Sequence, residues 1–125
     1  MESEKQKYTR RSGTDRVMAK TEELTRLIRA TDSFRRYQKD LELLKSQEDL
    51  YSRLNEFRRK SLYLDEQNER YYEISNVMYE EYKDTLTEPV VREFLASQAR
   101  INKLLRQVFD RIAADMEIDV SYMES

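Results

Sequence analysis

Residues 89–116 read PVVREFLASQARINKLLRQVFDRIAADM and give the strongest single indication of structure in this chain. The apolar residues of this stretch recur at steps of three and four, which places them on one face of an α-helix. They are Val91, Phe94, Leu95, Ile101, Leu105, Val108, Phe109, Ile112 and Met116. At 1.5 Å per residue the helix measures roughly 42 Å. A rod of this length with an apolar stripe needs other helices to cover it.

The composition extends this helical prediction to the whole chain. One glycine and one proline in 125 residues are too few for the turns of a sheet protein. Apolar and charged residues each make up 38%, so a lone set of thin helices buries little surface. We therefore expect an all-α fold of three to four long amphipathic helices. They should form an antiparallel bundle whose core is completed by oligomerisation.

The helices before residue 89 are separated by polar stretches. Thr87 or Glu88 should cap the last helix, with Pro89 in its first turn. A tyrosine-rich helix is expected over about 69–86, and an earlier one should start near Ser46, whose hydroxyl can cap it. Residues 65–68 are predicted to be a loop. A continuous helix through this loop is the alternative, because Phe57, Leu64, Tyr71 and Met78 keep a seven-residue spacing.

The apolar spacing predicts a first helical stretch from Thr14 to about Leu44. Leu27, Phe34 and Leu41 lie seven residues apart, so the helical phase is kept across residues 31–33. This favours one long helix, and a break with Ser33 as a new N-cap is the alternative.

Three parts of the chain follow from these patterns. Residues 1–13 are expected to form a disordered basic leader, because they carry Lys5, Lys7, Arg10 and Arg11 and little apolar bulk. Residues 14–120 should form the helical domain, and residues 121–125 a flexible tail.

The residue types exclude several classes of chemistry. The chain has no cysteine and no histidine, so thiolate ligands, disulfides, and the commonest general base and metal ligand are all absent. No run of about 18 apolar residues is present, and the first residues do not resemble a secretory signal. We expect a cytoplasmic protein that is not an enzyme and holds no cofactor.

Two basic clusters are candidates for partner binding. Arginine and tyrosine are enriched at protein-binding hot spots. The predicted partner-binding surface therefore joins these clusters with two tyrosines, and it comprises Arg35, Arg36, Arg58, Arg59, Tyr63 and Tyr72. The alternative is direct RNA binding by the same clusters together with residues 5–16. A net charge of −2 argues for weak or indirect RNA contact.

Polar and acidic residues suggest two further roles. Glu80, Glu81, Asp84 and Glu88 could hold Mg²⁺, although an ordinary charged helix face explains them better. Gln98 and Asn102 lie within the apolar stripe, where polar groups fix register and partner choice. The predicted oligomer interface comprises Val91, Phe94, Leu95, Gln98, Ile101, Asn102, Leu105, Val108 and Ile112.

Residues 22–120 resemble the YlbF/YmcA family of small bacterial helical cell-fate regulators, particularly its clostridial members. The matching segments are SFRRY at 33–37, LY at 50–51, NEFRRK at 55–60, YEEY at 79–82, PVVREFL at 89–95, and the end from Ile112 through Ile118-Asp119-Val120. Each segment is unspecific, and their order and spacing carry the resemblance.

The resemblance implies a non-enzymatic regulator that works through protein–protein contact. Relatives in bacilli assemble with related subunits, act with the endoribonuclease RNase Y in mRNA processing, and influence competence, sporulation and biofilm formation. Some family complexes hold iron–sulfur clusters through cysteines, a property that this chain cannot share without cysteine. The expected partners are a second copy, related family subunits and an RNase Y-type ribonuclease.

Overall fold

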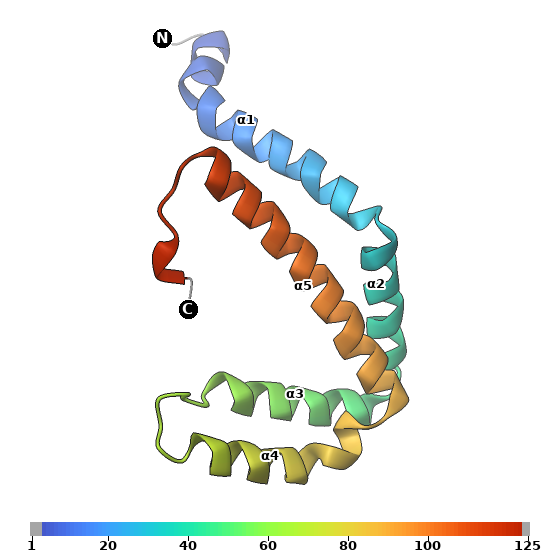
Figure 1. Cartoon of the computed structure of the whole chain (residues 1–125). Coiled ribbons are helices and arrows are strands. Elements are labelled where there is room, and N and C mark those ends of the chain that lie inside the picture. The colour runs from blue at the N-terminus through green and yellow to red at the C-terminus, as the bar shows by residue number, and fades with distance from the viewer. Residues whose placement is uncertain (1–3, 124–125) are drawn as a thin grey trace. The chain divides into compact units, whose positions relative to one another are not determined.

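All regular structure in the described part of the chain is helical. The structure is a computed structural model that describes the backbone of residues 4–123 and the side chains of residues 12–123. Its elements are α1 (Glu4–Arg29), α2 (Asp32–Lys45), α3 (Glu48–Leu62), α4 (Tyr71–Leu86), α5 (Pro89–Asp115) and a short 3-10 turn at Ser121–Met123 (Figure 1). The all-α prediction is confirmed, while the described helices outnumber the three or four expected. A bundle completed by oligomerisation stays a prediction.

The chain divides into two compact units, one up to Arg35 and one from Arg36 onward. In the first unit α1 begins at Glu4, earlier than the Thr14 start that the sequence indicated. Two threonine hydroxyls bond back to the helix: Thr21 donates to the carbonyl of Val17, and Thr25 to that of Thr21, each at 2.8 Å. The disordered leader over residues 1–13 and the flexible tail over residues 121–125 stay predictions, and their outer ends, residues 1–3 and 124–125, lie outside the described part.

The prediction of one helix from Thr14 to Leu44 is wrong, because the helix breaks between Arg29 and Asp32. Thr31 makes the break. Its hydroxyl accepts the amide N–H of Phe34 at 3.2 Å and donates to the carbonyl of Ile28 at 2.6 Å. Thr31 therefore ends α1 and caps α2 with one side chain. The weighed alternative had the right segment but placed the cap at Ser33.

The core of the second unit gathers residues from α2, α3 and α5. Leu44, Leu54, Val91 and Phe94 are fully buried and in contact with one another. Tyr37 of α2 stacks on Phe94 with ring centroids 5.7 Å apart. Partly buried side chains surround this cluster, including Leu41, Leu50, Tyr51, Phe57, Leu86, Val90 and Leu95. The first half of the α5 stripe therefore packs within its own chain.

Helices α3 and α4 form a hairpin whose connection is the predicted loop. Residues 63–70 separate the two helices, which excludes the continuous alternative. Ser46 does not cap α3 as expected. Its hydroxyl donates to the carbonyl of Leu43 at the end of α2, and Gln47 at the N-cap of α3 makes no side-chain bond. The serine thus closes one helix instead of opening the next.

Helix α5 begins where the sequence placed it, with Glu88 at the N-cap and Pro89 in the first turn. It contacts α3 and α4 and then runs away from their hairpin (Figure 1). Its buried residues Val91, Phe94, Ser97 and Ile101 lie in its first half. The second half, in which Ala113 is buried, diverges from the hairpin (Figure 1).

The end of α5 closes in a Schellman motif. Glu117 has φ of 57°, the left-handed conformation that usually takes glycine. The amide of Ile118 donates to the carbonyl of Ala113, and that of Glu117 to Ala114. Beyond it, the hydroxyl and then the amide of Ser121 lower the pKa of Asp119 by bonding to its carboxylate.

Candidate interaction surface

The nine residues of the predicted oligomer interface lie at different depths in this chain. Val91, Phe94 and Ile101 are buried; Leu95, Gln98 and Val108 are partly buried; Asn102, Leu105 and Ile112 are exposed. The stripe thus changes along α5 from core to surface. Their role in an oligomer stays a prediction, and the exposed members are the ones available to a partner.

The six predicted partner-binding residues have different surroundings in the structure, and their role in partner binding stays a prediction. Arg36 forms ion pairs with Asp40 at 3.3 Å and Glu93 at 3.2 Å. Tyr63 and Tyr72 are largely exposed, at 88% and 79%. Arg58 and Arg59 share a hollow on α3, described next. Arg35 is exposed, and it is the last residue of the first unit.

A shallow hollow on α3 and α5 holds the two arginines of the NEFRRK segment. We call it the arginine hollow, and its lining residues are Asn55, Arg58, Arg59, Leu62 and Gln98. Arg58 is fixed within it, because its guanidinium lies 5.4 Å from the centre of the Phe94 ring and donates to the side-chain oxygen of Asn55 at 3.3 Å. Leu62 at its edge is 81% exposed. Arginine is one of the residue types enriched at protein-binding hot spots, and the exposed leucine adds apolar surface beside it.

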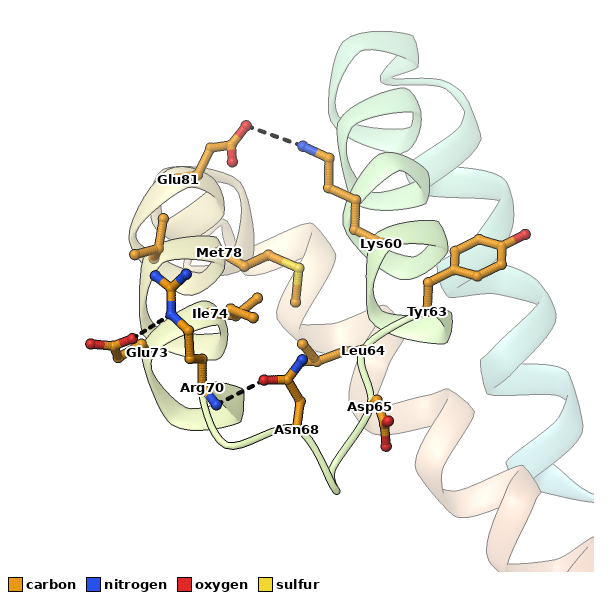
Figure 2. Close-up of a pocket in the computed structure, with 11 residues that line it drawn as sticks. Lys60, Tyr63, Leu64, Asp65, Asn68, Arg70, Glu73, Ile74, Met78 and Glu81 are labelled. Atoms are coloured by element: carbon orange, nitrogen blue, oxygen red, sulfur yellow. Dashed lines mark hydrogen bonds and ion pairs between the residues drawn. The ribbon is translucent and has the colours of Figure 1, made fainter.

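A larger groove opens on the other side of α3, between its C-terminal end, the loop and α4. We call it the hairpin groove, and it has a volume of about 600 Å³. Its lining residues are Lys60, Tyr63, Leu64, Asp65, Asn68, Arg70, Glu73, Ile74, Val77, Met78 and Glu81. Figure 2 shows Leu64, Ile74 and Met78 pointing toward one another between the two helices, while the Tyr63 ring points away. The groove therefore has an apolar floor.

Charged side chains form the rim of the hairpin groove. Lys60 pairs with Glu81 across the two helices at 3.3 Å, and Arg70 pairs with Glu73 at 2.9 Å (Figure 2). A hydrogen bond with Tyr82, and then the one with Glu81, raise the pKa of Lys60 above its ordinary value. Lys60 is therefore a permanent cation at neutral pH.

The tyrosine beneath this rim ties α3 to α4. Tyr82 is 1% exposed, and its ring lies 5.6 Å from that of Phe57. Arg53 and Lys60 approach the same ring at 4.7 and 4.9 Å from its centre. Arg53 also donates to the backbone carbonyl of Glu81 at 2.8 Å. These contacts keep the two walls of the groove in place.

One buried polar pair, Asp40 of α2 and Ser97 of α5, was not predicted from the sequence. Asp40 is 6% exposed and Ser97 is fully buried, and the serine hydroxyl donates to the carboxylate. Arg36 supplies the charge that balances Asp40. Ser97 lies three residues after Phe94 and four before Ile101, so it occupies a stripe position. Gln98 was predicted from the sequence to be a polar residue within the stripe. In the structure Gln98 is partly buried, and the smaller Ser97 is the residue that is fully enclosed.

The acidic set around Glu81 does not assemble into a metal site in the described part of the chain. Among residues with described side chains, no group of three potential ligands lies close enough to hold a metal ion. Glu81 is engaged with Lys60. No helix within the described residues is both long and apolar enough to cross a bilayer.

Comparison with known proteins places this architecture in a family. No curated protein and no solved structure was found to match the chain. A family model described as "Control of competence regulator ComK, YlbF/YmcA" matches residues 17–117, which include the second half of α1 and all of α2 to α5. Because the match covers well over half of the sequence, this chain belongs to the YlbF/YmcA family, whose description links it to the control of competence.

Proposed function

We propose that this protein is a non-enzymatic regulatory adaptor that acts in the control of competence through protein–protein contact. The family description supports the regulatory part of this proposal. The contact surface of α3 supports the adaptor part. Its partners are a second copy, related family subunits and a ribonuclease of the RNase Y type, and the resemblance of the sequence to the family motivates the last two.

The arginine hollow is the observation on which the adaptor role rests. Arg58 is held by Phe94 and Asn55, so little side-chain freedom is lost when it binds a partner. Leu62 exposes most of its side chain next to it and contributes little to the chain's own core. A pre-ordered arginine and an exposed aliphatic side chain together supply the polar and apolar halves of a protein contact.

Direct RNA binding is the alternative function, and the same geometry weakens it. Arg36 is neutralised by Asp40 and Glu93, and Arg58 lies against an aromatic ring. Phosphate binding requires several free cations along one surface. We therefore expect RNA contact to be weak and sensitive to salt.

The experiment compares three baits purified from the native host: the wild type, Arg58→Ala with Arg59→Ala, and Arg100→Ala with Lys103→Ala. The last pair removes the same charge from exposed positions on α5. We expect the arginine-hollow variant alone to lose its protein partners while it keeps the melting temperature within a few degrees, since Arg59 is exposed and Arg58 is only partly buried. Equal partner recovery by all three baits contradicts the proposed docking surface.

A further inference from the structure

We infer that the arginine hollow binds an acidic peptide segment of the partner, in which a carboxylate side chain lies close to an aliphatic or aromatic one. This inference rests on the proposed function and deepens it, because it gives the chemistry of the segment that the adaptor binds. The carboxylate pairs with Arg58 and Arg59, and the apolar side chain packs on Leu62. All residues that line the hollow belong to the unit from Arg36 onward.

The lining of the arginine hollow carries positive charge and no negative charge. It consists of two arginines, two side-chain amides and a leucine. Neither Arg58 nor Arg59 takes part in an ion pair among the residues whose side chains are described. The neighbouring carboxylate on α3, Glu56, accepts the hydroxyl of Tyr82 on α4 at 3.4 Å. An anionic group of a partner therefore meets two cations whose charge is not already balanced.

The other two cations of α3 are directed toward α4. Lys60 pairs with Glu81, and Arg53 donates to the backbone carbonyl of the same residue at 2.8 Å. In the hairpin groove, Lys60 and Arg70 thus each have a carboxylate partner within the chain. The arginine hollow differs from the hairpin groove in this respect, and it is the surface of α3 that offers charge to a partner.

Arg58 presents its guanidinium with most of its donors unused. An arginine has five N–H donors, and Arg58 uses one of them on the side-chain oxygen of Asn55 at 3.3 Å. The Phe94 ring, 5.4 Å away, holds the guanidinium in place. A carboxylate can accept two parallel hydrogen bonds from this planar group, which are stronger than bonds to a neutral acceptor. The geometry therefore favours a carboxylate.

Gln98 and Leu62 extend the site beyond its charge and favour a peptide. Gln98 is partly buried, and its amide makes no hydrogen bond to any residue with a described side chain. An amide both donates and accepts, so it can pair with a peptide backbone. Leu62 is 81% exposed and lies about 6 Å beyond Arg58 along the helix axis. Side chains two residues apart in an extended segment have a similar separation, so such a segment contacts both residues.

A carboxylate suits this position better than a phosphate does. The hollow lies on the second half of α3, which ends at Leu62. The C-terminal end of a helix carries the negative end of its dipole, which disfavours a doubly charged group more than a singly charged one. Nucleic acids are bound by several cations along one surface, and the hollow offers two.

Selection of random peptides displayed on phage, with the full chain as the immobilised target, tests this inference. The wild type should enrich peptides that place Asp or Glu two residues from Leu, Ile or Phe. Two charge reversals at exposed positions serve as parallel targets: Arg59→Glu in the hollow and Arg100→Glu on α5. The first should lose the pattern and the second should keep it. Circular dichroism confirms that both variants keep their helicity.

A synthetic copy of an enriched peptide then tests each contact by fluorescence anisotropy. Its affinity should fall several-fold when its acidic residue is replaced by the corresponding amide, because the charged hydrogen bonds are lost. Leu62→Ser should weaken binding by a similar factor, and added salt should weaken it further. An oligouridylate competitor should leave the peptide bound.

A selection that yields no shared pattern, or that yields basic or uncharged peptides, would overturn the acidic-peptide site. Displacement of the peptide by oligouridylate would also overturn it and assign the hollow to RNA. A failed selection leaves the adaptor role standing, because partner capture by the Arg58→Ala, Arg59→Ala bait is measured separately. Conversely, selective peptide binding with equal partner recovery by all three baits would support the site and contradict the proposed function.

Discussion

Asp40 and Ser97 link two helices that are far apart in the sequence. The hydroxyl of Ser97 donates to the buried carboxylate of Asp40. In the described structure, Arg36 forms the ion pair that balances the charge of this carboxylate. Such a pair stabilises the fold mainly because each buried polar group has a hydrogen-bond partner. A buried polar group left without its partner costs about 1–3 kcal/mol of stability. The pair therefore fixes which side of α2 faces α5.

Ser97→Ala should lower the free energy of unfolding by about 1–3 kcal/mol, because Asp40 loses its buried donor while the volume barely changes. Ser52→Ala, at an exposed position of α3, is the matched control and should change it by less than about 0.5 kcal/mol. Urea denaturation measures both. Equal effects of the two substitutions would show that the bond to Asp40 contributes nothing specific.

Residue patterns predicted where polar groups enter the stripe but not which one is enclosed. Ser97 and Gln98 are adjacent, and each lies three or four residues from apolar residues of the stripe. The apolar spacing therefore does not decide which of the two side chains is buried. The choice depends on how closely α2 approaches, a distance that the sequence does not contain. For the same reason the stripe predicted α5 correctly without showing that Val91 and Phe94 are core while Leu105 and Ile112 are exposed.

At the scale of elements, helix ends were harder to predict than helix interiors. Pro89 marked the start of α5 and residues 65–68 the loop, because proline and polar runs act locally. The break before α2 was missed, since the seven-residue spacing of Leu27, Phe34 and Leu41 continues across it. A single hydroxyl on Thr31 makes that break, and apolar periodicity does not register it.

Thr31→Ala should therefore destabilise the protein by about 1 kcal/mol, the usual loss when a threonine N-cap is removed. Thr31→Ser retains the hydroxyl and should restore most of the stability. Thermal unfolding followed by circular dichroism distinguishes the two. If serine fails to rescue the alanine variant, the contribution of Thr31 comes from its methyl group and not from the cap.

Glu117→Gly should raise the free energy of unfolding by about 1 kcal/mol. A side chain with a Cβ is strained in the left-handed conformation that ends α5, and glycine is not. Glu117→Ala removes the carboxylate but keeps the Cβ, so it should give no comparable gain. A stabilising alanine variant would assign the effect to charge near the helix C-terminus.

At the scale of the whole molecule, the described residues leave apolar side chains exposed on the second half of α5 and along the hairpin groove, away from the core at the start of α5. The low apolar fraction of the sequence predicted a core completed by oligomerisation. Leu105, Phe109 and Ile112 of α5 and Met116 at its C-cap are among the apolar side chains that the described part leaves exposed. Both observations support the self-association that we propose. The identity of a heterologous partner does not, because it depends on a surface outside this chain.

Leu105→Asp should convert the assembly to single chains without unfolding them. Leu105 is 47% exposed in its own chain, so the fold tolerates a carboxylate there, whereas a covered interface does not. Light scattering should give at least twice 15.2 kDa for the wild type and one chain mass for the variant. Lys103→Asp, on the opposite face, should keep the wild-type mass. A wild-type monomer with full helicity would contradict self-association.

The most direct measurement of the adaptor role is affinity purification of the tagged protein from its native host, with and without ribonuclease treatment. Contact through protein surfaces predicts that the captured partners survive ribonuclease, and that Arg58→Ala with Arg59→Ala removes them from both samples. If ribonuclease removes every partner and leaves the wild-type protein alone, the protein acts through RNA and the adaptor account is contradicted.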